Sequence, residues 1–176
     1  MREIQKKNSN DLMLNNSQHQ NSSTNLDESN ERYLTFWTDD QLFGIPIAAV
    51  EQIVKMQKIT VIPEFPDYAK GVIDLRGNMI PIIDVRLRLH KKEVAYNERT
   101  CIIVTDIQEK LIGLIVDAVD EVTKIENATI SAPPKITSDA TDSYLTGIAK
   151  CENKVILLLD SEKILKNEEI SEIVQD

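Results

Sequence analysis

The apolar residues of this chain lie in short segments, and in several of them large apolar residues alternate with smaller or polar ones, as in half-buried β-strands. Tyr33–Thr38 and Leu42–Ile47 are the first two segments, and the Asp39-Asp40 pair between them predicts a tight hairpin turn. Pro46 has no backbone N–H to donate, which predicts that the second strand lies at a sheet edge or is bulged there.

The same pattern continues along the chain. Further predicted strands are Val50–Met56, Gly71–Arg76, Asn78–Ile83, Thr100–Asp106, Leu111–Val116, Ala118–Ile125, Tyr144–Ala149 and Val155–Leu159. Two more hairpins are predicted, one turning at Arg76–Asn78 and one at Glu152-Asn153. Many short strands with little helix between them predict an all-β fold of antiparallel β-barrels.

Two aspartates stand directly before segments that follow a predicted strand. Because aspartate is a preferred N-cap residue, we interpret Asp84 and Asp160 as helix caps rather than as a catalytic carboxylate pair. After the first, Val85–Leu89 fits either a short helical turn or a continued strand. After the second, a helix is predicted that runs to about Val174.

Two pairs of segments indicate an internal repeat. Gly71–Leu89 aligns with Gly147–Leu165 at an offset of 76 positions, and Phe43–Met56 aligns with Ile112–Ile125 at an offset of 69. Two offsets in the same order predict one ancestral unit used twice, with a few residues inserted in the second copy. Chance similarity between short apolar strands is the alternative explanation.

Composition bounds the domain organisation. A chain of 176 residues with 41% hydrophobic residues is long enough for one domain, or for two small lobes that share a core. Residues 1–30 are rich in Asn, Ser and Gln and poor in large apolar groups, which predicts a disordered N-terminal tail. We expect residues 31–166 to form the folded domain and residues 167–176 to form a C-terminal helical extension.

The charge argues against two classes of partner. With a net charge of −9, the chain lacks the basic surface that binding to nucleic acid or to an anionic membrane requires. No apolar run reaches the length of about 18 residues that a membrane-spanning helix needs. The N-terminus has no apolar core like that of a signal peptide, so we expect a cytoplasmic protein.

Reactive chemistry is sparse in the sequence. Cys101 and Cys151 stand alone in apolar strands and are expected to be reduced core thiols, while His19 lies in the predicted tail and His90 at the end of an element. Metal-ligand spacings and the nucleotide-binding glycine motifs are missing, so no cofactor is expected.

Arg76 is the most distinctive polar residue, because it lies at the tip of a predicted hairpin where its repeat counterpart is Glu152. A guanidinium on a rigid turn offers five fixed donors to a partner's carboxylates. We predict that its side chain is at least partly exposed and makes no essential contact within the domain. The competing hypothesis is that it pairs with a carboxylate of its own domain, such as Asp74 or Asp84.

Four segments of the chain carry a family resemblance. GVIDLRGNMIPIIDVR (71–86) resembles the signature of CheW, the coupling protein family of bacterial chemotaxis, and the likeness continues in FGIPIAAVEQI, LIGLIVDAVDEV and YLTGIAKCENKVILLLD. It covers roughly residues 33 to 165. The resemblance implies two five-stranded, SH3-like β-barrels packed around a shared core, which agrees with the repeat.

The resemblance also implies binding residues. Val50 and Ile53 match the strand region that binds the kinase, with Val119 and Val122 as their repeat partners for comparison. Arg76 matches the arginine that the family uses for coupling. Receptor binding is further implied for Cys101, Ile102 and Ile103, which match strand positions lining a groove between the barrels, although Cys101 stands where an aliphatic residue is commoner.

The function implied by the resemblance is that of a freestanding, non-enzymatic scaffold adaptor. Its partners are the regulatory domain of the histidine kinase CheA and the cytoplasmic tips of methyl-accepting chemotaxis receptors, and it is recruited from the cytoplasm to membrane-associated receptor arrays. The alternative is a small β-barrel domain that binds a ligand or catalyses a reaction in the cleft between its lobes. A buried, convergent set of ionisable side chains favours the alternative, and an open apolar groove with edge strands favours the adaptor.

Overall fold

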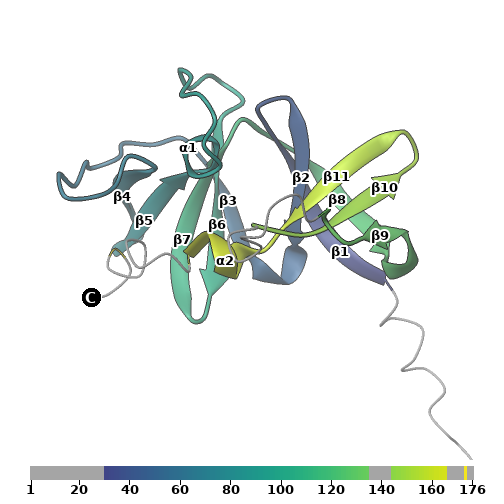
Figure 1. Cartoon of the computed structure of the whole chain (residues 1–176). Helices are drawn as coiled ribbons and strands as arrows, with labels where there is room; N and C mark the ends of the chain where they lie inside the picture. The colour runs from purple at the N-terminus through teal and green to yellow at the C-terminus, as the bar shows by residue number, and fades with distance from the viewer. Residues whose placement is uncertain (1–29, 135–143, 166–172, 174–176) are drawn as a thin grey trace, which may run out of the picture.

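The computed structural model describes residues 30–134, 144–165 and 173 (Figure 1). The predicted tail therefore lies outside the described residues except for residue 30, and the predicted helix after Asp160 is described only to residue 165 and at residue 173. The strands are β1 (Asn30–Thr38), β2 (Gln41–Pro46), β3 (Val50–Lys55), β4 (Ala69–Leu75), β5 (Asn78–Asp84), β6 (Cys101–Ile107), β7 (Lys110–Val116), β8 (Ala118–Glu126), β9 (Ile130–Ser131), β10 (Leu145–Cys151) and β11 (Lys154–Leu159). The helices are α1 (Val85–Arg88) and α2 (Ser161–Leu165), with single 3-10 turns η1 (Ile47–Ala49) and η2 (Asn127–Thr129).

The strands form two sheets, which Figure 1 shows side by side as two lobes. Lobe A has the order β8-β1-β2-β11-β10-β9, and lobe B has the order β3-β6-β7-β5-β4. The all-β fold of two SH3-like lobes predicted from the sequence is therefore confirmed. Lobe A has one strand more than the predicted five, because the two-residue strand β9 pairs with β10. In lobe B the corresponding contact is a single bridge between Thr60 and Val72.

The registers of the two sheets confirm the internal duplication. In lobe B the parallel pair β5–β7 places Ile82 opposite Gly113, and in lobe A the parallel pair β11–β2 places Leu158 opposite Gly44. Leu158 lies 76 positions after Ile82, and Gly113 lies 69 positions after Gly44, which are the two offsets of the sequence alignment. If the similarity of the apolar strands were due to chance, the paired residues of the two sheets would not be related by both offsets at once.

The two repeats exchange strands. The first repeat contributes β1 and β2 to lobe A, and β3, β4 and β5 to lobe B. The second repeat contributes β6 and β7 to lobe B, and β8, β10 and β11 to lobe A. In particular, β3 pairs with β6 and β8 pairs with β1, each across the repeat boundary. Neither lobe can therefore form from one repeat alone.

Local sequence determines the turns and helix starts. The carboxylate oxygen Oδ1 of Asp84 accepts the N–H of Arg86 at 2.9 Å, and that of Asp160 accepts the N–H of Glu162 at 3.0 Å, so both predicted N-caps are confirmed. The segment after Asp84 is helical rather than extended. The prediction for Pro46 was wrong: β2 lies inside its sheet, and Pro46 is its last residue, beyond the part that pairs with β11.

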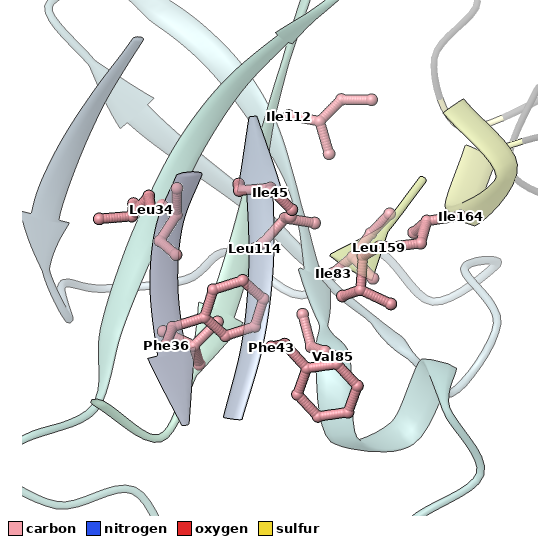
Figure 2. Packing of buried hydrophobic residues seen from close by; sticks show 12 residues of the cluster. Leu34, Phe36, Phe43, Ile45, Ile83, Val85, Ile112, Leu114, Leu159 and Ile164 are labelled. Carbon is pink, nitrogen blue, oxygen red and sulfur yellow. The ribbon is translucent and has the colours of Figure 1, made fainter. Parts of the chain in front are cut away.

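Three apolar clusters hold the fold together. Each lobe has a cluster in its own interior, and a third, the central cluster, lies between the lobes and draws on both. Its buried members are Leu34, Phe36, Phe43, Ile45, Ile83, Val85, Ile103, Ile112, Leu114, Val116, Leu159 and Ile164. Figure 2 shows the side chains of β1 and β2 facing those of β5, β7 and α2 in this cluster. A shared apolar core of this kind keeps two lobes together as one unit.

Candidate partner-binding surfaces

The β4–β5 turn presents Arg76 at its tip. Arg76 and Gly77 both have positive φ, 55° and 87°, which is the conformation of a tight type I′ hairpin turn. The N–H of Gly77 donates to Oδ1 of Asp74 at 2.8 Å, and this bond fixes the turn. The turn defines the backbone of Arg76, so its side chain projects from a set position at the hairpin tip.

The Arg76 side chain is exposed, as predicted from the sequence. Within the described part of the chain it makes no hydrogen bond or ion pair with another described residue. The carboxylates named in the competing hypothesis have other partners, because Asp74 accepts from Gly77 while Asp84 caps α1 and accepts from the hydroxyl of Tyr96 at 2.8 Å. The guanidinium is therefore available to a partner.

An exposed apolar side chain lies next to this tip. Met79 pairs with Asp74 in the hairpin and is 59% exposed. Sequence reasoning missed Met79 as a candidate contact, although its place beside Asn78 at the start of a strand was a usable signal. An exposed thioether next to an exposed guanidinium gives the β4–β5 turn both an apolar and a charged contact point.

The two predicted kinase-binding residues lie on β3, an edge strand of lobe B. Ile53 is 45% exposed, whereas Val50 is half-buried and packs against the central cluster. Their repeat partners on β8 behave in the same way: Val119 packs against the central cluster, and Val122 is 53% exposed. Burial therefore leaves Ile53 open to a partner, but the similar burial in both lobes favours a structural role for these positions over a binding site specific to β3.

The prediction that Ile102 and Ile103 line a receptor groove needs correction, because both side chains are fully buried, at 0% exposure. Their strand β6 lies between β3 and β7 and is covered on both faces. Ile102 faces the interior of lobe B, and Ile103 faces the central cluster. The uninterrupted apolar run CIIV was the sequence signal for such a doubly buried strand.

Cys101 remains a candidate at the start of the same strand. It is half-buried and packs against the central cluster. Burial raises the pKa of its thiol, with a smaller opposing effect from a hydrogen bond with the backbone of Val119 on β8. Cys101 of lobe B thus meets β8 of lobe A, at the boundary between the lobes. A thiol with a raised pKa stays protonated near neutral pH and acts as an apolar contact rather than a nucleophile.

Lobe A contains a pocket of about 360 Å³ between β8 and the β10–β11 hairpin. Leu42, Ile156 and Cys151 are among its lining residues, and several exposed Lys and Glu side chains surround it. This pocket belongs to one lobe and not to a cleft between the lobes. Among the described residues, no three His, Cys, Asp or Glu side chains are grouped as a metal site requires.

Together, the features above define a two-lobed, SH3-like β-barrel domain whose distinctive groups, Arg76 and the exposed apolar side chains, face outward from turns and edge strands. None of the helices in the described ranges has the length and apolar character needed to cross a membrane. A domain of this kind is suited to contact with other proteins.

The comparisons with known proteins identify the family. The family model of the CheW-like domain matches residues 32–169, and the chain belongs to this family. The chemotaxis protein CheW of Klebsiella aerogenes is 33% identical over 141 residues, which cover 80% of this chain and 85% of that protein. The chemotaxis protein CheW of Rhizobium meliloti is 32% identical over 149 residues, covering 85% of this chain and 96% of that protein.

A solved structure shares the fold. The crystal structure of the scaffolding protein TtCheW from Thermoanaerobacter tengcongensis superimposes with a TM-score of 0.72 at 34% sequence identity, and the match covers 79% of this chain and 94% of that chain. The family and this structure establish the chain as a CheW-family scaffold protein of chemotaxis. The relatives are named as chemotaxis proteins rather than as enzymes.

Proposed function

We propose that this protein is a non-enzymatic adaptor that couples methyl-accepting chemotaxis receptors to the histidine kinase CheA. The observation that carries the proposal is the exposed side chain of Arg76, which lies on a turn with positive φ and makes no hydrogen bond or ion pair with another described residue. Glu152 has the same backbone conformation at the equivalent turn, so the turn geometry follows from the fold, and it is the unpaired guanidinium at this position that a partner's carboxylate can receive.

The receptor-binding residues in this proposal are Arg76 and Cys101. Arg76 supplies a donor fork for a carboxylate of the receptor, and Cys101 supplies a small apolar contact where the two lobes meet. Ile102 and Ile103 do not contact the receptor in this proposal, because their buried side chains belong to the core that supports β6. The folded adaptor domain spans residues 31–166, and it acts in the cytoplasm at membrane-associated receptor arrays.

The kinase-binding surface in this proposal is centred on Ile53. Its side chain is flanked on the exposed face of β3 by Glu51 and Lys55, and the strand forms an edge of lobe B. An edge strand offers unpaired backbone groups to a related β-barrel such as the kinase's regulatory domain. Val50 supports this surface from its half-buried position.

The decisive test replaces Arg76 and compares it with the equivalent tip of lobe A. Arg76→Ala is expected to change the free energy of unfolding by less than about 0.5 kcal/mol, as at other surface sites. Receptor-dependent kinase activation should nevertheless fall strongly, and Arg76→Lys should restore only part of it, because an ammonium keeps the charge but not the fork. Unfolding in urea and coupled kinase activity are measured on the same variants.

Glu152→Ala is the matched control, because Glu152 occupies the same position of the β10–β11 turn with a φ of 52°. It should leave both activation and stability nearly unchanged. Loss of stability in Arg76→Ala, or equal loss of activation in the two variants, would contradict the proposal.

A second test concerns the kinase. Ile53→Glu is expected to abolish binding of the kinase's regulatory domain, because a charge at the centre of an apolar contact is desolvated without a partner. Val122→Glu at the equivalent, similarly exposed position of β8 is the control and should bind normally. Isothermal titration calorimetry with both variants decides the matter, and an equal effect of the two substitutions would show that β3 is not the specific surface.

A further inference from the structure

Arg88 is a buried cation at the boundary between the two lobes. It ends α1, is only 3% exposed, and is the one buried Lys or Arg side chain among the described residues. Its guanidinium carbon lies 4.7 Å from the ring centroid of Tyr68 and 4.7 Å from that of Tyr144. Its Nε donates a hydrogen bond to the carbonyl oxygen of Ile164 at 3.1 Å.

These contacts cross from one lobe to the other. Arg88 and Tyr68 flank strands of lobe B, since α1 follows β5 and Tyr68 precedes β4. Tyr144 and Ile164 flank strands of lobe A, since Tyr144 precedes β10 and α2 follows β11. The guanidinium therefore lies between one tyrosine of its own lobe and one of the other.

The same four residues are related by the internal duplication. Tyr144 lies 76 positions after Tyr68, and Ile164 lies 76 positions after Arg88. The two tyrosines also make equivalent backbone hydrogen bonds. The carbonyl oxygen of Tyr68 accepts the N–H of Asp84, and that of Tyr144 accepts the N–H of Asp160, each at 2.8 Å. A residue that touches its own repeat counterpart lies at the axis that relates the repeats. At this axis the first repeat supplies an arginine and the second an isoleucine.

The chemistry of the contact differs from that of its surroundings. The central cluster is apolar, and apolar contacts are non-directional, so they hold the lobes together without selecting one relative angle. Cation–π contacts and hydrogen bonds are directional. A single polar group inside an apolar interface is a known way to select one arrangement among several that pack similarly.

We infer that Arg88 is a positioning residue that fixes the orientation of lobe A relative to lobe B. In combination with the proposed function, on which this second step rests, it also sets the receptor-facing surface, because Cys101 of lobe B meets β8 of lobe A there. The kinase-facing residue Ile53 lies on β3 of lobe B and outside the central cluster, so we expect it to be less sensitive to the angle between the lobes.

The structural test compares four variants by residual dipolar couplings of backbone amides, fitted separately for the strands of each lobe. Arg88→Met keeps much of the apolar volume but removes the donor and the charge, and it should rotate or loosen lobe A relative to lobe B while each lobe still fits its own couplings. Tyr144→Leu, which removes the cross-lobe ring, should act in the same direction. Tyr68→Leu, in the arginine's own lobe, should have a smaller effect, and the exposed Arg99→Met should have none.

The inference is overturned if Arg88→Met and Tyr144→Leu keep the wild-type orientation, or if Tyr68→Leu changes it as much as Tyr144→Leu does. Should Arg88→Met fail to fold, Tyr144→Leu and Arg88→Lys decide the question. Arg88→Lys retains the charge without the planar group, and we expect an intermediate orientation.

The functional test uses the same variants with a receptor fragment and with the kinase's regulatory domain. Arg88→Met should weaken binding of the receptor fragment by at least about fivefold, a typical size for coupling between sites, and leave kinase binding within about twofold. Equal loss of both would indicate a general structural defect and contradict the positioning role. If the unsubstituted protein binds neither fragment, the proposed function fails, while the dipolar couplings still decide the role of Arg88.

Discussion

Lobe A and lobe B share their strand order and register but differ in the side chains that they present. The tip of the β4–β5 turn in lobe B is Arg76, and the same position of the β10–β11 turn in lobe A is Glu152, with φ values of 55° and 52°. The backbone is thus the same, and the charge is opposite. Duplication preserved the geometry of the turn, while the group available to a partner diverged.

The ends of the two barrels differ as well. In lobe B, Val54 and Leu75 pack against the lobe's interior cluster. Their repeat counterparts in lobe A are Thr123 and Cys151, which line the pocket of about 360 Å³. The pocket in lobe A is thus lined by a hydroxyl and a thiol at two positions where lobe B has aliphatic side chains.

The comparison teaches which positions a duplicated fold can vary. Many positions of the central cluster are apolar in both repeats, as with Leu34 and Ile103, because a change in one repeat disturbs both lobes when strands are exchanged between them. Ile164 is an exception, since its counterpart is Arg88. Turn tips and barrel ends touch few other residues, so they can diverge without cost to the fold. Partner recognition is expected where equivalent positions differ, as they do at Arg76 and Glu152.

The largest expected effect concerns equivalent core positions. Leu34 and Ile103 are related by the 69-residue offset, and both are buried in the central cluster. Leu34→Ala and Ile103→Ala should each cost about 2–5 kcal/mol of unfolding free energy, because a cavity forms in a packed core. Urea unfolding measures both. A cost below about 1 kcal/mol for Ile103→Ala would indicate that Ile103 is not a core residue, which would support its sequence-based assignment to the receptor surface. It would also contradict the equivalence of the two lobes at this position.

A smaller, unequal effect is expected at two equivalent glycines. At Gly71 a Cβ would lie 2.0 Å from the carbonyl oxygen of Thr60, and φ is +139°, whereas at Gly147 the nearest atom would be a methyl group of Ile130 at 2.6 Å. A side-chain methyl group can move and a backbone carbonyl cannot easily do so. Gly71→Ala should cost about 3 kcal/mol and Gly147→Ala about 1–2 kcal/mol.

Thermal or urea unfolding of the two glycine variants sharpens the comparison. Equal costs would show that the two barrels close with the same tightness. A larger cost at Gly147 would contradict the expectation that the backbone carbonyl at Gly71 yields less than the side-chain methyl group at Gly147.

The smallest expected effect depends on pH and concerns a salt bridge of Arg86 that has no equivalent in the second repeat. Arg86 donates to both carboxylate oxygens of Asp117, at 2.7 to 3.1 Å, and to Asp39, while its repeat counterpart is Glu162. Burial raises the pKa of Asp117, but the hydrogen bonds from Arg86 and from the N–H of Asp39, with the charge of Arg86, outweigh it and lower the pKa.

A lowered folded-state pKa contributes stability that is present above the unfolded value, about 3.9, and is lost as the pH falls through the folded value. Arg86→Gln should therefore cost about 1–2 kcal/mol at pH 7, a value discounted for partial exposure, and progressively less below about pH 4. Urea unfolding across this range measures the difference between the two proteins. A difference that does not change with pH would show that the bridge contributes by packing rather than by charge.

The sequence by itself determined the local structure and the duplication. Alternation of apolar residues located the strands, the Asp-Asp and Arg-Gly pairs located two turns, and Asp84 and Asp160 located the helix starts, because these features depend on neighbouring residues only. The two offsets of the repeat were also readable, since identical pairing demands similar residues. The same local signals located Arg76 at a hairpin tip.

Only the tertiary structure decided how the repeats share their strands and which apolar residues face a partner. Ile102 and Ile53 are both isoleucines in strands, yet one is covered on each side by neighbouring elements and the other lies on an edge strand, and this depends on strand order rather than on sequence pattern. The contact of Arg88 with Tyr144 and Ile164 likewise requires the two lobes to be in place. Contacts between residues far apart in the chain arise from packing, which a local pattern does not encode.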